Sequence, residues 1–176
     1  DVPVEAASWM VSMLPFATVV FAPIFGLLVD KIGHGTRWML TGAVLALIAH
    51  LMLAFAPSGI PFYGYLSMVF LGFGYSLVPA AMWPSVPKIV PNKVLGTAYS
   101  LIYWVQNLGL MSFKMFAGKI LADTNLDKGV SEAGAFWVEV MFVAVCVVAL
   151  LLALSLSVYS RRNPHLKMDV PDRAVK

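Results

Sequence analysis

Residues 136–158 read FWVEVMFVAVCVVALLLALSLSV, and Glu139 is the one charged side chain in this run. About 20 consecutive apolar residues in an α-helix span the hydrocarbon core of a bilayer, whereas a strand of a membrane barrel needs about 10 residues that alternate in polarity. The run has the helical length and lacks the alternation. It therefore predicts a transmembrane helix.

The whole chain has the composition of a membrane protein. Of its 176 residues, 60% are hydrophobic and 12% are charged, and the mean hydropathy is +0.84. Apolar runs of spanning length recur, so we predict an all-α fold, a polytopic membrane helical bundle. The predicted spans are residues 8–29, 38–56, 62–89, 97–122 and 136–159. Residues 1–160 then form the transmembrane part, and residues 161–176 form a solvated cytoplasmic tail.

Lysine and arginine residues predict the orientation of the bundle. An odd number of spans puts the two termini on opposite sides of the membrane, and these residues gather in cytoplasmic loops. One side has Lys128 alone, and the other side has Lys31, Arg37, Lys88, Lys93, Arg161, Arg162, Lys167, Arg173 and Lys176. We therefore expect the N-terminus outside and the C-terminus in the cytoplasm. The basic residues are interpreted as topology signals, so no nucleic acid partner is expected.

Several features limit the chemistry that is expected of the chain. It has no zinc-protease, nucleophile-elbow or phosphate-loop pattern and no metal-spaced Cys/His cluster, so we expect no catalytic residue, metal site or cofactor. Cys146 is expected to be a packing residue of the last span. His50 is expected to hydrogen-bond a neighbouring backbone group, with proton transfer as the alternative. The start at Asp1, without methionine or a basic segment, predicts a piece of a longer protein and no signal peptide.

The fourth span, residues 97–122, combines an apolar helix with a polar face. At 100° per residue, its polar side chains fall within an arc of about 120°. They are Tyr99, Ser100, Tyr103, Gln106, Asn107 and Lys114. The second and fifth spans are nearly uniformly apolar, as expected of helices that face lipid. Polar groups in a bilayer need partners or water, so we expect the first, third and fourth spans to line a hydrated cavity.

The two lysines of the fourth span have different expected roles. Lys119 lies near the outer end and off the polar face, where it can reach the headgroups or pair with Glu139 of the next helix. Lys114 lies on the polar face, roughly 12 Å from the helix end at 1.5 Å per residue, which is too deep for easy contact with headgroups. Two interpretations of Lys114 remain open: contact with a hydrated cavity or a substrate, and a buried pair with a group outside these spans.

Residues 26–38, between the first two spans, read GLLVDKIGHGTRW. This stretch resembles the signature of the major facilitator superfamily, a glycine, three residues, then Asp-Arg/Lys-x-Gly followed by basic residues. The matching residues, here called the motif segment, are Gly26, Asp30, Lys31, Gly33 and Arg37; His34 and Gly35 depart from the pattern. Gly26 permits close helix contact, and Asp30 can face the positive end of a helix dipole in the other half of the protein. The resemblance implies that this segment holds the cytoplasmic side shut in one conformation.

The resemblance implies that the five spans are helices eight to twelve of a twelve-helix major facilitator fold, with the N-terminal six-helix half as partner. Residues 76–124 contain Trp-Pro, Val-Pro, LGTAY and QNLGL, and they are similar to the lysosomal dipeptide uniporter-like branch and its bacterial relatives. That branch implies a secondary transporter that moves a small organic solute, first of all a dipeptide, by alternating access. In that model, Tyr103, Gln106 and Asn107 would offer hydrogen bonds to the solute. Lys114 could hold its carboxylate as a point charge, but this role comes from helical spacing alone, because an apolar residue is expected at that position in the branch.

Other functions remain open on the sequence alone. A transporter-like membrane subunit with a structural or assembly role fits the same spans, and so does a drug or metabolite exporter of the superfamily. Enzymatic activity is not expected. The expected surroundings are the lipid bilayer of a plasma or bacterial inner membrane, with a lysosomal membrane as the alternative.

Overall fold

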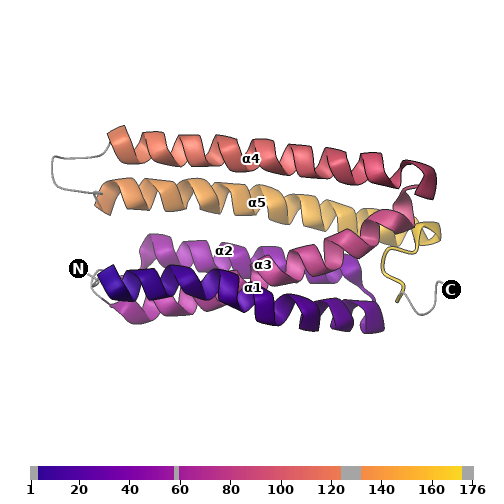
Figure 1. Ribbon diagram of the computed structural model, residues 1–176, viewed down its shortest axis with the longest axis horizontal. Coiled ribbons are helices and arrows are strands. Elements are labelled where there is room, and N and C mark those ends of the chain that lie inside the picture. The colour runs from indigo at the N-terminus through magenta and orange to yellow at the C-terminus, as the bar shows by residue number, and fades with distance from the viewer. Residues whose placement is uncertain (1–3, 58–59, 124–131, 172–176) are drawn as a thin grey trace.

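The computed structural model describes residues 4–57, 60–123 and 132–171, and these residues are mostly helical and form no strand (Figure 1). Five long helices follow one another: α1 (Val4–Ile32), α2 (Gly35–Phe55), α3 (Pro61–Ile89), α4 (Leu95–Asp123) and α5 (Glu132–Arg162). Two short 3-10 turns, η1 (Asn92–Val94) and η2 (Pro164–Leu166), follow α3 and α5. The structure confirms the predicted all-α bundle.

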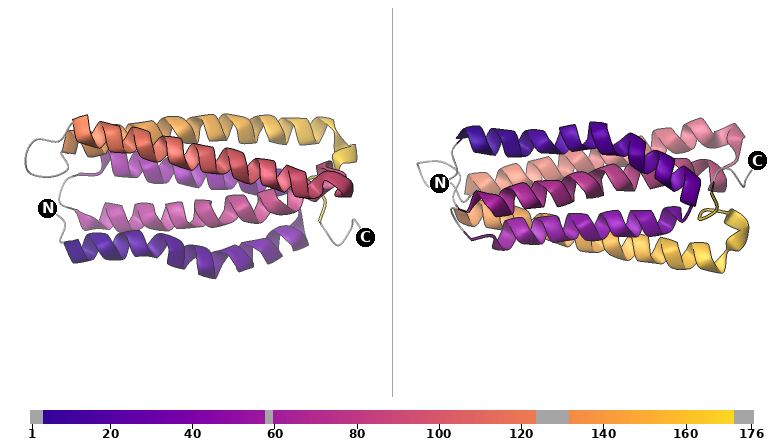
Figure 2. Two further views of the ribbon diagram at one scale, coloured as in Figure 1. Left: turned by 45° about the horizontal axis from the view of Figure 1, so that its top comes forward. Right: turned by 90° about the horizontal axis from the view of Figure 1, so that it is seen from below.

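The five helices lie side by side and alternate in direction, so the bundle has two ends (Figures 1 and 2). One end holds the α1–α2 loop, the α3–α4 connection and the last described residues, and we call it the tail end. Of the basic residues predicted to share one side, seven lie at this end: Lys31, Arg37, Lys88, Lys93, Arg161, Arg162 and Lys167. Lys128, Arg173 and Lys176 lie outside the described residues.

Glycines make the closest contact between helices possible. A Cβ atom at Gly42 of α2 would lie 2.5 Å from Cγ2 of Val78, and one at Gly74 of α3 would lie 2.8 Å from the carbonyl oxygen of Gly42. A Cβ atom at Gly72 would lie 2.8 Å from Cβ of Ala17 on α1. Small residues let membrane helices approach each other closely, and here they join α3 to both α1 and α2.

The helices differ in how much of their surface other helices cover. α2 packs extensively against α3 and α5, and α3 packs against α1 as well. By contrast, α4 has no buried residue and contacts mainly α5 and the end of α3. The sequence predicts that the second span faces lipid over much of its circumference; the structure differs, because two faces of α2 are used for packing.

Four of the helices, α1, α2, α3 and α5, are long and apolar enough to cross a membrane. α4 has 29 residues, the same length as α1 and α3, so it also has the reach of a transmembrane helix. Its polar face and Lys119, which lies off that face, lower its hydropathy below that of the other four. The lower hydropathy of α4 therefore reflects the polar face and not a shorter helix.

Part of the predicted solvated tail folds back onto the bundle. Residues 164–171 lie against the tail end, and the Met168 side chain is only 3% exposed. The sequence prediction of a solvated tail is wrong for this segment, since an apolar residue and an aspartate find partners on the helices. The remaining tail, residues 172–176, lies outside the described residues.

Candidate functional site

The predicted polar side chains of the fourth span share one exposed side of α4. Tyr103 is 53% exposed, and Gln106, Asn107 and Lys114 are exposed as well. Tyr99 is half-buried at the start of the row. These five residues, together with Ser100, which is also exposed, form the polar face of α4. Because α4 packs only lightly against its neighbours, this face is open to a ligand or to another part of the protein.

Trp83 of α3 fixes the tail end of the polar face. Its ring stacks on the Tyr103 ring, with 4.8 Å between centroids and an angle of 27° between planes. The Tyr99 hydroxyl donates a hydrogen bond of 3.2 Å to the Trp83 carbonyl oxygen, and the two rings lie 5.6 Å apart. No contact of Trp83 was predicted from the sequence. Its position before Pro84, opposite two tyrosines of the next helix, is the signal that was available.

The middle of the polar face keeps its hydrogen-bonding capacity. The Asn107 amide nitrogen donates to the Tyr103 carbonyl oxygen at 2.8 Å, one turn earlier in the same helix, so its amide oxygen stays an outward acceptor. Gln106 and Lys114 form no hydrogen bond or ion pair with any residue that the structure describes. Lys114 therefore has no partner among the described residues, and both interpretations of its role stay predictions.

The motif segment surrounds the α1–α2 loop at the tail end. Gly33 has a φ of 75°, in the left-handed region that glycine adopts without strain, and its carbonyl oxygen accepts a hydrogen bond of 2.9 Å from Nε1 of Trp38. Lys31 and Arg37 are exposed on either side of the loop, and Asp30 is half-buried. A Cβ atom at Gly26 would meet nothing within 4 Å. The close helix contact predicted at Gly26 is not made with any described residue.

Glu139 has a different partner from the predicted one. Its carboxylate lies 2.7 Å from Nδ1 of His50 on α2, and within the described residues it forms no ion pair with Lys119. Of the two alternatives expected for Lys119, the pair with Glu139 is thus wrong for this structure, because Glu139 points toward α2 and Lys119 is exposed on α4. His50 was expected to bond a backbone group, and it contacts a carboxylate instead.

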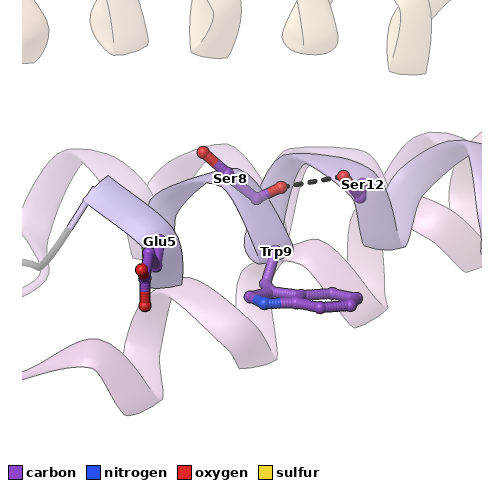
Figure 3. A pocket seen from close by; sticks show the side chains of 4 residues that line it. All are labelled: Glu5, Ser8, Trp9 and Ser12. Atoms are coloured by element: carbon purple, nitrogen blue, oxygen red, sulfur yellow. Dashed lines mark hydrogen bonds between the residues drawn. The ribbon is translucent and has the colours of Figure 1, made fainter.

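A surface hollow of about 310 Å³ lies along the first turns of α1 and is lined by Glu5, Ser8, Trp9 and Ser12 (Figure 3). All four residues come from one helix, and the Ser12 hydroxyl donates to the Ser8 carbonyl oxygen at 2.8 Å. Residues three or four apart share a helix face, so the hollow is a groove along the exposed side of α1. It contains no residue of the polar face of α4 or of the motif segment.

Comparison with known proteins identifies similar sequences. The model of the family described as Major Facilitator Superfamily matches residues 1–175. The chain is similar to proteins named lysosomal dipeptide transporter MFSD1: it is 37% identical to that of Mus musculus over 158 residues and 36% identical to that of Homo sapiens over 157 residues. Each match covers 89% of this chain and 31% of the relative. The match to the Bos taurus protein is 40% identical over 147 residues and covers 84% of this chain and 29% of the relative.

Proposed function

This chain belongs to the major facilitator superfamily, and from that premise we propose that it is the C-terminal part of a secondary transporter for a small organic solute. Dipeptides or similar amino-acid-derived compounds are the first candidates for the solute. The names of the similar proteins, which call them dipeptide transporters, support this choice. Transport without chemical conversion of the solute is proposed, so no residue is assigned a catalytic role.

The polar face of α4 is the observation that supports the proposal most directly. It places a cation, two amides and two phenol groups along one side of a helix whose opposite side is mainly apolar. A dipeptide at neutral pH presents a carboxylate, an ammonium group and a peptide bond. The Lys114 ammonium group is proposed to hold the carboxylate, with hydrogen bonds from Gln106 and Asn107 to the peptide group.

The missing part of the pathway is proposed to come from an N-terminal six-helix half of the same protein. The chain spans 29 to 31% of the length of the relatives above, so most of such a protein lies outside it. The polar face of α4 lies next to exposed apolar residues of the same helix, such as Leu110 and Met111. Such a mixed surface is typical of one that another helix covers or that water fills. Alternating access would then move the two halves around a solute held at this face.

We propose that the tail end faces the cytoplasm. Seven basic residues lie at this end in the structure, and such residues favour the cytoplasmic side of membrane proteins. The motif segment lies at the same end, which suits a role in closing the cytoplasmic side. A plasma or bacterial inner membrane and a lysosomal membrane are both compatible with this orientation, and the names of the relatives support the lysosomal one.

The test is transport by the full-length protein in proteoliposomes. We expect a panel of dipeptides to be taken up with saturation, and unlabelled dipeptides to compete with the labelled one. Uptake of drugs or other metabolites without any dipeptide uptake would replace the substrate class and keep the transport function. No uptake of any solute, together with stable binding of another membrane protein, would favour a structural or assembly role.

A further inference from the structure

The chain turns sharply after α5, and local residues explain the turn. Asn163 ends the helix: its amide nitrogen donates to the Tyr159 carbonyl oxygen at 3.0 Å, and Pro164 then has no N–H group to continue the helix. After η2, Lys167 adopts a φ of 52°, in the left-handed region, and the Val170 N–H donates back to the Lys167 carbonyl oxygen at 3.1 Å. These turns direct residues 164–171, here called the strap, back to the bundle.

Asp169 is the main contact between the strap and the helices. Its carboxylate accepts hydrogen bonds from the Thr36 backbone N–H at 2.9 Å, from the Thr36 hydroxyl at 2.8 Å, and from the Ser160 hydroxyl at 2.8 Å. The Asp169 carbonyl oxygen accepts another from the His34 backbone N–H at 2.8 Å. Thr36 is 1% exposed and Ser160 is 6% exposed, so these donors are enclosed.

The carboxylate of Asp169 serves as the N-cap of α2. The residue in the capping position, His34, forms no hydrogen bond with its own side chain, and the first N–H groups of a helix need acceptors. Asp169 supplies this acceptor and a negative charge where the helix dipole is positive. Burial alone would raise the pKa of Asp169, but hydrogen bonds from Ser160 and Thr36 outweigh it and lower the pKa below its ordinary value.

The strap reaches three parts of the bundle at once. The Lys88 ammonium group of α3 donates to the Val170 carbonyl oxygen at 2.9 Å, and Ser160 ties the strap to α5. At the α1–α2 loop, a Cβ atom on Gly33 would lie 2.5 Å from the Asp169 carbonyl oxygen, so only glycine leaves room for the strap. Beneath this loop, a Cβ atom on Gly35 would lie 3.1 Å from the Ser85 hydroxyl of α3.

We propose that the strap locks the α1–α2 loop onto the end of α3, with Asp169 as the positioning residue, and so limits how fast this end of the protein opens. The lock rests on the hydrogen bonds of Asp169 to Thr36, His34 and Ser160, and on the bond from Lys88 of α3 to the Val170 carbonyl oxygen. The loop and the strap must separate before the start of α2 can move away from α3. The proposal rests partly on the proposed function, because the opening of the tail end matters most in a protein that alternates between conformations.

The first test measures the lock without any transport assay. In the full-length protein, a cysteine replaces Ser85, which is 5% exposed, in a background without other reactive cysteines. We expect slow reaction with a maleimide in this parent, and at least about tenfold faster reaction when Asp169→Ala is added, since loss of a hydrogen bond to a charged group has about this effect. Trypsin cleavage after Lys167 is expected to accelerate in parallel. His165→Ala, an exposed change in the same segment, is the control and should leave both rates unchanged.

The second test connects the lock to transport. We expect Asp169→Ala to change the maximal rate of solute exchange several-fold and to leave the half-saturating concentration unchanged, because Asp169 lies at the tail end and not on the polar face of α4. Asp169→Glu should restore part of the slow maleimide reaction. If Asp169→Ala leaves the maleimide and trypsin rates at the parent values, the lock does not exist. If both rates rise while the maximal rate stays the same, the strap is a structural element only. If no solute is transported at all, the proposed function fails, and the labelling rates still decide on the lock.

Discussion

His50 of α2 and Glu139 of α5 are polar partners inside an otherwise apolar interface between these two helices. Nδ1 of His50 lies 2.7 Å from Oε2 of Glu139, and both side chains are largely buried, at 14% and 22% exposed. The His50 ring also stacks on Phe142 of α5, with 5.1 Å between ring centroids. A polar group in this position needs a partner, since lipid offers none. The pair therefore joins α2 to α5 and fixes their relative rotation.

The first prediction concerns the energy of this pair. We expect His50→Ala and Glu139→Ala each to lower the stability of the purified full-length protein, because each leaves the other polar group without its partner. A double-mutant cycle should give a coupling energy of about 0.6 to 2 kcal/mol, the range found for hydrogen bonds between membrane helices. Unfolding in mixed detergent micelles provides the free energies.

Lys119→Met is the matched control for this cycle. The sequence places Lys119 where it could reach the headgroups or pair with Glu139, whereas the structure has Lys119 exposed on α4 and Glu139 beside His50. The changes in unfolding free energy caused by Lys119→Met and Glu139→Ala should add, within about 0.5 kcal/mol, when the two substitutions are combined. If Glu139 shows a coupling energy with Lys119 and none with His50, then Lys119 and not His50 is the partner of Glu139.

The second prediction compares two glycines of α3. Gly74→Ala places a Cβ atom 2.8 Å from the Gly42 carbonyl oxygen and 3.2 Å from the Ala46 nitrogen, both rigid backbone atoms. We expect a loss of about 1 to 3 kcal/mol in stability from this overpacking. Gly64→Ala meets only the flexible Met10 side chain, at 3.0 Å, and should change stability by less than about 1 kcal/mol. Equal effects of the two substitutions on the unfolding free energy would contradict the close α2–α3 contact.

The helices were predictable because their signals are local. The predicted span 62–89 corresponds to Pro61–Ile89, and the span 97–122 to Leu95–Asp123, since apolar length and bounding prolines or polar residues appear in the sequence itself. The shared face of Tyr103, Gln106 and Lys114 also follows from helical spacing alone. Its exposure in the structure agrees with the expected polar surface, while its role in solute binding stays a prediction.

Contacts between elements were not predictable in the same way. Spacing along α5 gives the side of the helix on which Glu139 lies, but it does not tell which neighbouring helix faces that side. The bond between Thr36 and Asp169 joins residues 133 positions apart, and a short polar tail has no pattern that indicates such a partner. Gly33 was recognised through a motif, yet the need for glycine there becomes clear only with the Asp169 carbonyl oxygen beside it.

The third prediction concerns the pH dependence of the strap. Because the pKa of Asp169 is lowered in the folded protein, its stabilising effect is complete above the ordinary pKa of an aspartate, about 3.9, and disappears as the pH falls through the lower folded value. We expect the melting temperatures of wild type and Asp169→Asn to differ by a constant amount from pH 8 to 5. The difference should shrink only below about pH 4. A difference that already shrinks between pH 7 and 5 would mean that the pKa is raised.

The fourth prediction concerns Lys114, with Lys119 as its matched control on the same helix. Both lysines are exposed on α4, but only Lys114 lies on the polar face. We expect Lys114→Met to weaken the apparent affinity for dipeptides by about tenfold or more, since a hydrogen bond to a charged group is worth about 1.5 to 3 kcal/mol. The apparent affinity of Lys119→Met for dipeptides should stay within about twofold of that of wild type. The measurement is the concentration dependence of uptake into proteoliposomes.

A dipeptide with an amidated C-terminus separates the role of the Lys114 charge from a general effect on folding. If the ammonium group binds the solute carboxylate, the amidated dipeptide binds wild type and Lys114→Met equally weakly, because the pairing is lost in both cases. If Lys114→Met leaves both the uptake rate and the apparent affinity for the free dipeptide unchanged, Lys114 is not a solute ligand. The partner of this amine would then be a group of the N-terminal half, and a carboxylate there should show coupling with Lys114 in unfolding experiments.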